Sequence, residues 1–152
     1  MDLRIRRADL PQPDDGRAVL ALTRDYARDP MGNGGDLPAE VGAVLIERLQ
    51  AHPTTRIFLA YEDSEAVGIA TCFLGFSTFN ARPLLNVHDL HVVKSHRRHG
   101  VATRLLQAVE EEARALGCCK VTLEVQEKNH TAQGLYERLG FVSAGLFREK
   151  RL

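Results

Sequence analysis

The chain has 152 residues, a length typical of one domain. Its 20 Lys and Arg residues equal its 20 Asp and Glu residues, so it lacks the net basic charge that usually accompanies nucleic-acid binding. No apolar run reaches the roughly 18 residues that span a bilayer, and the first residues do not read as a signal peptide. We therefore expect a cytoplasmic protein with no nucleic-acid and no membrane partner.

The N-terminal half predicts one strand and two helices. Alternating apolar and basic residues favour a strand over 3–7, and apolar residues at helical spacing favour a helix over about 14–28. Residues 29–36 hold three glycines and a proline, which is typical of a loop. A second helix follows from Pro38 and ends near His52.

The C-terminal half alternates between strands and helices. The expected elements are strands over 56–61, 66–76 and 84–93, a helix over 100–116, a strand over 119–125, a helix over 130–139 and a last strand over 140–147. Residues 77–83 are expected to form a loop, and Gly117 the C-terminal cap of the long helix. This order predicts one α/β domain over 1–152 with a mixed sheet.

Three cysteines are present, and Cys118 and Cys119 are adjacent, which suits reduced thiols better than a structural disulfide. There is no CxxC pair, and no further ligand accompanies His88, Asp89 and His91, so we expect no metal site.

The segment between the strand over 84–93 and the following helix has the features of an anion site. Free backbone N–H groups and the helix dipole favour a phosphate at a helix N-terminus, and Gly100 allows close backbone approach. Arg97 and Arg98 add positive charge. Considered by itself, the spacing fits an ordinary turn with solvated arginines equally well. The Walker and Rossmann glycine motifs are absent.

Two motifs resemble the GNAT family of N-acetyltransferases. Arg97-Arg98-His99-Gly100-Val101-Ala102 matches its Q/R-x-x-G-x-G/A motif, and the run from Asn129 to Phe141, with Tyr136 in a short helix, resembles its second signature. The resemblance implies a single-domain GNAT-like fold with a mixed, mostly antiparallel central sheet flanked by helices. The stretch from His88 to Tyr136 is similar to diamine acetyltransferases.

The resemblance also implies acetyl-CoA as co-substrate, with no metal. It implies binding through the turn, the central strand and the last helix, at Arg97, Arg98, His99, Gly100, Val101, Ala102, Thr103, Leu90, His91, Val92, Asn129, Thr131 and Tyr136. Most of these contacts are expected from the main chain. Arg98 stands where the family usually has glycine, which puts the fine geometry of the turn in question, and Ala102 is an accepted variant.

Acetyl transfer needs a base, because an aliphatic amine is mostly ammonium at neutral pH, and an acid for the departing thiolate. The resemblance places the base position at His88, a common acidic residue at Asp89 and the general acid at Tyr136. Adjacent side chains of a strand point to opposite faces, so His88 and Asp89 share a face only if a bulge intervenes. Glu124 or a water relay are the alternative bases.

The acceptor is harder to read. The family fold places the loop between the first two helices against the acceptor, and here that region carries Asp25, Asp29, Asp36 and Glu40. These residues favour a cationic amine, unless they are merely dispersed charges of a solvated loop.

We expect direct acetyl transfer to a primary amine of a small molecule in a ternary complex. The alternatives are a non-catalytic acyl-CoA-binding module and a protein or peptide N-acetyltransferase. An apolar final strand suggests a homodimer, the commonest oligomer.

Overall fold

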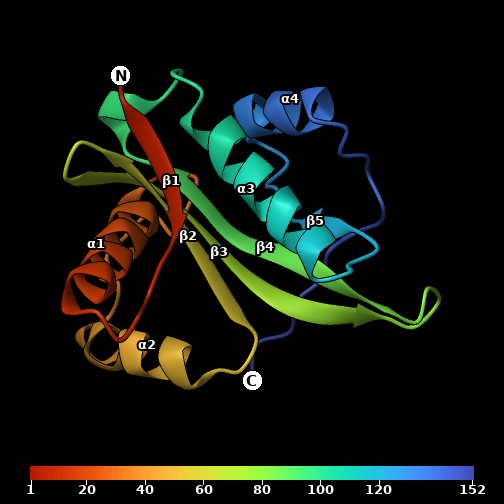
Figure 1. The fold of residues 1–152 in the computed structure, drawn as a ribbon, viewed down its shortest axis with the longest axis horizontal. Helices are drawn as coiled ribbons and strands as arrows, with labels where there is room; N and C mark the ends of the chain where they lie inside the picture. Colours follow the sequence, from red (N-terminus) through yellow and green to blue (C-terminus); the bar gives the residue numbers. More distant parts are fainter.

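A computed structural model describes all 152 residues and centres on one five-stranded sheet with the strand order β1-β2-β3-β4-β5 (Figure 1). The first four strands pair antiparallel, and β5 pairs parallel to β4. The strands are β1 (Leu3–Arg7), β2 (Thr55–Glu62), β3 (Glu65–Ser77), β4 (Arg82–Val92) and β5 (Val121–Leu123). The expected mixed, mostly antiparallel sheet is confirmed.

Helices cover both faces of the sheet, two on each (Figure 1). They are α1 (Pro13–Arg28) and α2 (Ala39–Ala51) on one face, and α3 (Val101–Ala115) and α4 (His130–Arg138) on the other. A short 3₁₀ turn, η1 (Lys94–His96), leads from β4 towards α3. Gly117, with φ 74°, directly follows the C-terminal cap of α3, as expected.

Each face of the sheet has its own apolar cluster. On the α3 side, Leu85 and Val87 of β4 pack with Leu105 and Val109 of α3. On the α1 side, Val19 and Leu22 of the helix pack against Ile57, Leu59 and Ile69 of the sheet. The sheet is therefore buried on both faces, and its long central strands are shared by two layers.

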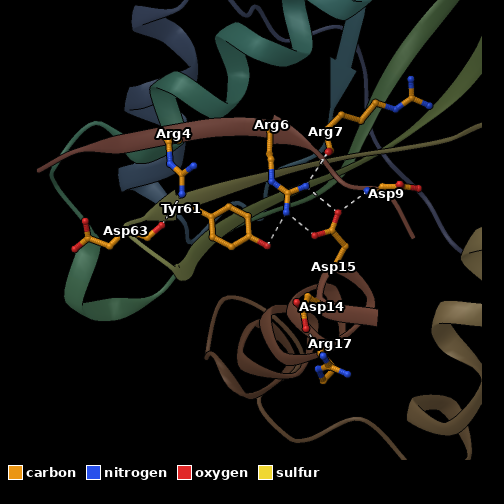
Figure 2. A network of polar contacts seen from close by, with 9 residues as sticks. All are labelled: Arg4, Arg6, Arg7, Asp9, Asp14, Asp15, Arg17, Tyr61 and Asp63. Carbon is orange, nitrogen blue, oxygen red and sulfur yellow. Dashed lines mark hydrogen bonds and ion pairs between the residues drawn. The ribbon is translucent and has the colours of Figure 1, made fainter. Parts of the chain in front are cut away.

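An ion pair between a buried carboxylate and a half-exposed arginine fastens the N-terminal end of α1 to β1 (Figure 2). The Arg6 guanidinium donates to both carboxylate oxygens of Asp15, at 2.8 and 2.5 Å, and the Asp9 backbone N–H donates to the same carboxylate at 2.6 Å. The guanidinium also stacks over the Tyr61 ring at 4.9 Å. Asp15 is 2% exposed, and the Arg6 hydrogen bond lowers its pKa.

A one-residue bulge interrupts β4. Asp89 lies opposite Thr71 of β3, whereas Val87 lies opposite the next residue, Cys72, so His88 is the additional residue on β4. A bulge of this kind turns two successive side chains towards one face and bends the strand. This is the condition under which His88 and Asp89 can share a face.

The expected last strand is wrong: residues 140–147 form no regular structure. Val142, Leu146 and Phe147 are 85, 80 and 65% exposed. The alternating pattern predicted a strand, but a strand also needs a partner edge, and β5 has three residues where seven were expected over 119–125. The loop expected over 77–83 is shorter as well, because β3 ends at Ser77 and β4 begins at Arg82. None of the helices has the length and apolar composition needed to cross a membrane.

Candidate active site at the divergence of two strands

The strands β4 and β5 part at the bulge. Their pairing ends where Val87 meets Leu123, and β4 continues to Val92 without a neighbour on that side. The Val93 N–H donates to the Val67 carbonyl on the β3 side. Because successive backbone groups of a strand point to alternate edges, those of Leu90 and Val92 point towards the open side. Arg97 donates to the Val92 carbonyl on this side, so the Leu90 N–H and carbonyl and the Val92 N–H remain available to an extended ligand.

The N-terminus of α3 lies at the end of this open edge. Gly100, with φ 79°, is its capping residue, and no side chain caps the helix. The backbone N–H groups of Val101, Ala102 and Thr103 precede the first helical hydrogen bond, which Arg104 donates to the Gly100 carbonyl. A Cβ at Gly100 would meet nothing within 4 Å, so the left-handed conformation rather than space requires glycine there.

The two arginines of the turn differ in what they contact. Arg97 donates through Nε to the Val92 carbonyl at 2.9 Å and through Nη2 to Asp29 at 2.5 Å, so its side chain joins β4 to the loop after α1. Arg98 and His99 are exposed at the mouth of the turn and are free to meet an anion. Arg98 also has φ 67°, which explains why glycine suits this position.

Asp89 is a carboxylate without a hydrogen-bonding partner in the protein. It is half-buried and opposite the buried Thr71. Burial raises its pKa above the ordinary value for an aspartate, and the neighbouring imidazoles of His88 and His91 act in the opposite direction. The group can therefore take up a proton more readily than a surface aspartate.

His88 lies on the same face, as the bulge allows. Its exposed ring meets the Phe73 ring edge-on, with the ring centroids 5.7 Å apart. It faces α2, whereas Asp89 lies towards α1, where it acts on the pKa of the Tyr26 phenol. The bulge thus presents two titratable groups side by side.

His91 contributes a side chain as well as its backbone. It is 5% exposed, its Nε2 lies 2.6 Å from Asp25 Oδ2, and its ring lies 5.2 Å from that of Tyr26. Both partners belong to the last turns of α1. His91 and Arg97 therefore hold the C-terminal end of α1 against the open part of β4.

Tyr136 is brought to the same region from α4. It is 9% exposed, and its ring lies edge-on to Phe141 at 5.8 Å. Burial, with a smaller contribution from Tyr26, raises the pKa of Tyr136 to about 12, so the phenol is protonated at neutral pH. Asn129 caps α4 by accepting from the Ala132 N–H at 3.2 Å, while Thr131 is exposed on the first turn.

Comparison with known proteins decides the family. The model of the acetyltransferase (GNAT) family matches residues 19–141. The chain belongs to the GNAT family. Members of this family take their acetyl group from acetyl-CoA, so the fold and enzyme class expected from the sequence are confirmed.

The relatives vary in what they are named for. The chain is 30% identical to the uncharacterized N-acetyltransferase YhfO of Bacillus subtilis over 139 residues, which cover 91% of this chain and 89% of the relative. It is 26% identical to an aminoglycoside N(6')-acetyltransferase type 1 of Acinetobacter genomosp. 13 over 100 residues, 63% of this chain and 68% of the relative. The fold is shared with the solved structure of AAC(6')-Iy in complex with a CoA bisubstrate analog, at a TM-score of 0.81, 20% identity and 100% coverage of both chains.

The acidic residues beside the acceptor side of this acetyltransferase are mostly paired. Asp25 lies 2.6 Å from His91, Asp29 2.5 Å from Arg97 and Asp36 2.8 Å from Arg28. Burial acts to raise the pKa of Asp29, but hydrogen bonds from Arg97 and the Met31 N–H lower it overall. The loop acids are therefore engaged within the protein, which weakens the expectation that they attract a cationic amine.

Two further residues near the site, Tyr26 and Gln126, were not predicted as site residues from the sequence. Tyr26 belongs to the helix expected over 14–28, and its ring lies against that of His91. The charge of Asp89 raises the pKa of Tyr26, and Tyr26 in turn contributes to the raised pKa of Tyr136. Gln126 donates to the Met31 carbonyl at 2.9 Å and so connects the segment after β5 to the loop after α1. Both contacts join segments far apart in the chain, for which one sequence offers no local signal. Glu124, the alternative base, is exposed just beyond β5.

Proposed function

We propose that this chain transfers the acetyl group of acetyl-CoA directly to a primary amine of a small molecule, within a ternary complex. In this proposal residues 1–152 form one catalytic domain. The observation that carries it is an uncapped helix N-terminus at the end of an open strand edge. Asp89 and Tyr136, both with raised pKa values, are each close enough to Tyr26 for one group to act on the pKa of the other.

Acetyl-CoA would supply the activated acyl group, and the chain offers groups suited to each of its parts. The N–H groups from Val101 to Thr103, with Arg98 and His99, suit the pyrophosphate. The N–H and carbonyl of Leu90 and the N–H of Val92, on the open edge of β4, suit the amides of the pantetheine arm and offer an N–H for the acyl oxygen. Asn129 and Thr131 flank this site from α4.

In the proposed mechanism Asp89 removes the proton that makes the acceptor an ammonium ion. The neutral nitrogen can then form the new N–C bond as the C–S bond breaks. His88 stands beside Asp89 and can relay the proton to solvent because it is exposed. We therefore assign the base to Asp89 and a supporting role to His88, reversing the expected order.

Tyr136 would donate its phenolic proton to the departing thiolate. Its raised pKa makes it a weaker acid than a free phenol, but burial raises the basicity of a thiolate as well. Cys72, whose burial raises its thiol pKa to about 12, illustrates the effect within this protein. The pKa values of the Tyr136 phenol and of the CoA thiol therefore rise together when both groups are buried.

Calorimetric titration with acetyl-CoA, alongside an assay of CoA release with a panel of amines, tests the proposal. Gly100→Val should weaken acetyl-CoA binding by at least about tenfold, because valine disfavours φ 79° and would distort the anion site. Gly117→Val is the matched control: it has similar strain, with φ 74° and open space, at the other end of the same helix.

Equal acetyl-CoA affinity in folded Gly100→Val and Gly117→Val would contradict the proposed site. Binding without CoA release for any amine would favour the non-catalytic module instead.

We further propose that the protein forms a homodimer. Two separate regions expose large apolar side chains. The first is the end of β3 and the turn after it, with Phe76 and Phe79, and the second is the C-terminal tail, with Val142, Leu146 and Phe147. Exposed apolar patches commonly mark interfaces. Light scattering at micromolar concentration should give twice the chain mass of 16.9 kDa, and a species of 16.9 kDa would contradict the dimer.

A further inference from the structure

A groove of about 370 Å³ adjoins the β4 bulge, between α2 and the sheet. Its volume lies within the usual range for small-molecule sites, about 300–1,000 Å³. The lining consists of three apolar or aromatic residues and three basic or imidazole side chains: Leu45, Leu49, Phe73, Arg48, His52 and His88. His88 belongs both to this groove and to the bulge, so the groove ends at the residue that precedes Asp89 in β4.

The interior of the groove is aromatic. Phe73 lies between two imidazoles, with centroid distances of 5.2 Å to His52 and 5.7 Å to His88, and both meet it edge-on. The Leu45 and Leu49 side chains of α2 face it. Such a lining suits the flat, apolar body of a ligand.

The charge at the rim is positive. Arg48 is exposed and forms no ion pair within the protein, so its guanidinium is free to bind a carboxylate in a two-pronged geometry. The acidic residues Asp25, Asp29 and Asp36 are engaged by His91, Arg97 and Arg28. Glu40 has no such partner, and together with Arg48, two helical turns later in α2, it lines a neighbouring groove.

We propose that this groove holds the body of the acceptor, and that the acceptor is an amine with an aromatic body and a carboxylate at its far end. The inference rests on the proposed function and deepens it by naming a substrate class. The amine lies at Asp89, the aromatic body against Phe73 and the carboxylate at Arg48. Polyamines and aminoglycosides, with several positive charges, are poor matches for this lining.

A matched pair of substrates tests the charge preference. Wild-type kcat/KM is measured by CoA release for 4-(2-aminoethyl)benzoate and for 2-phenylethylamine, which differ in the carboxylate, with spermidine and kanamycin as polycations. The carboxylate-bearing amine should be favoured over 2-phenylethylamine by about tenfold or more, the scale of a charge-assisted hydrogen bond. Both polycations should react more slowly than either aromatic amine.

Variants then assign the preference to the groove. Arg48→Gln should raise KM for the carboxylate-bearing amine about tenfold and leave KM for 2-phenylethylamine and acetyl-CoA unchanged. Arg17→Gln, at an exposed arginine of α1, is the control and should change neither. Phe73→Leu should slow both aromatic amines alike and keep their ratio.

The possible failures are distinguishable. If spermidine or kanamycin is the best substrate, or if Arg48→Gln leaves the ratio unchanged, the substrate class is overturned while the proposed function stands. If acetyl-CoA binds and no amine of any kind is acetylated, both are overturned.

Discussion

Two carboxylates near opposite ends of α1, Asp15 on the helix and Asp89 on β4, are in opposite situations. At the N-terminal end, Asp15 is enclosed and accepts hydrogen bonds from Arg6 and the Asp9 N–H, and its pKa is lowered. Facing the C-terminal end, Asp89 is partly enclosed, accepts no hydrogen bond from the protein, and has a raised pKa. Both are sheltered from water by the same helix and sheet.

The difference lies in the partners supplied. A buried carboxylate with matched donors is stabilised as the anion and fixes the elements that carry it. A sheltered carboxylate without hydrogen-bond donors destabilises the folded protein when it is charged. Its pKa is therefore raised, and it holds a proton at a pH where Asp15 does not. The first arrangement builds the fold, and the second leaves a group free for chemistry.

The largest expected effect is that of Asp89→Asn on activity. Loss of a general base should lower kcat/KM by about 10²–10⁴-fold. In wild type, kcat/KM should rise with pH through the raised pKa of Asp89, and this limb should be absent from the variant, which then follows the acceptor's own ionisation. The pH profiles of both proteins, with His88→Gln as companion, provide the measurement.

A decrease of less than about threefold in Asp89→Asn would move the base to His88 or Glu124, since base catalysis contributes far more. The same variant should be more stable than wild type at neutral pH. A carboxyl with a raised folded-state pKa loses stability as pH rises through that value, and asparagine has no charge to bury. The thermal midpoint should rise by a few degrees, since ~1 kcal/mol corresponds to about 2–4 °C in a domain of this size.

Tyr136→Phe should remove the proton donor and keep the ring packed against Phe141. We expect kcat to fall by about 10²-fold, with acetyl-CoA affinity within twofold of wild type. Single-turnover CoA release and calorimetric titration separate the two quantities. A comparable loss of affinity would indicate that the hydroxyl binds acetyl-CoA rather than donating a proton.

Asp15→Asn tests the other end of α1. The free energy of unfolding should decrease by about 2–3 kcal/mol, below the largest values for buried pairs because Arg6 is half-exposed and can return to water. The folded variant should keep the wild-type kcat/KM. Because the pKa of Asp15 is lowered by folding, its stabilisation is present above pH ~4 and is lost as pH falls further.

Urea unfolding at pH 7 and at about pH 2.5 measures both effects for Asp15→Asn, and the difference between variant and wild type should narrow at the lower pH, which lies below the unfolded pKa of an aspartate. A pH-independent difference would show that packing, not the ion pair, holds this end of α1.

The smallest expected effect concerns backbone strain beside the site. Arg98→Gly should raise the free energy of unfolding by about 1 kcal/mol, because φ 67° is unfavourable for arginine and not for glycine. Arg98→Ala is the matched control, which removes the charge and keeps the strain. No stabilisation by glycine relative to alanine would mean that the turn relaxes without strain.

The sequence predicted most elements because their patterns are local. Apolar residues at helical spacing located α1 and α3, and the alternation in residues 3–7 located β1. The last strand failed for the opposite reason: whether residues 140–147 pair depends on the edge that β5 presents, and that edge is three residues long.

The candidate site was predictable in its backbone and not in its side chains. Gly100 and Ala102 located the anion turn because the motif reflects a backbone conformation, the left-handed one that Gly100 adopts at the start of α3. The partners of Arg97 and the environment of Asp89 depend on contacts with α1 and the loop that follows it. Arg97 and Asp29, for example, lie 68 residues apart in the sequence. Nothing within the motif specifies such contacts.

The bulge in β4 also acts as a shift of reading frame. Before it, the odd-numbered Leu85 and Val87 belong to the cluster on the α3 side; after it, the even-numbered Leu90 and Val92 do. Removing one residue at His88 would therefore not merely delete an imidazole. Either the first half of the strand would turn its apolar residues towards α2, or the second half would turn His91 into the apolar layer beneath α3. Because the residues of β4 that face α3 change from odd to even numbers at the bulge, the strand tolerates a substitution at this point far better than a change in length.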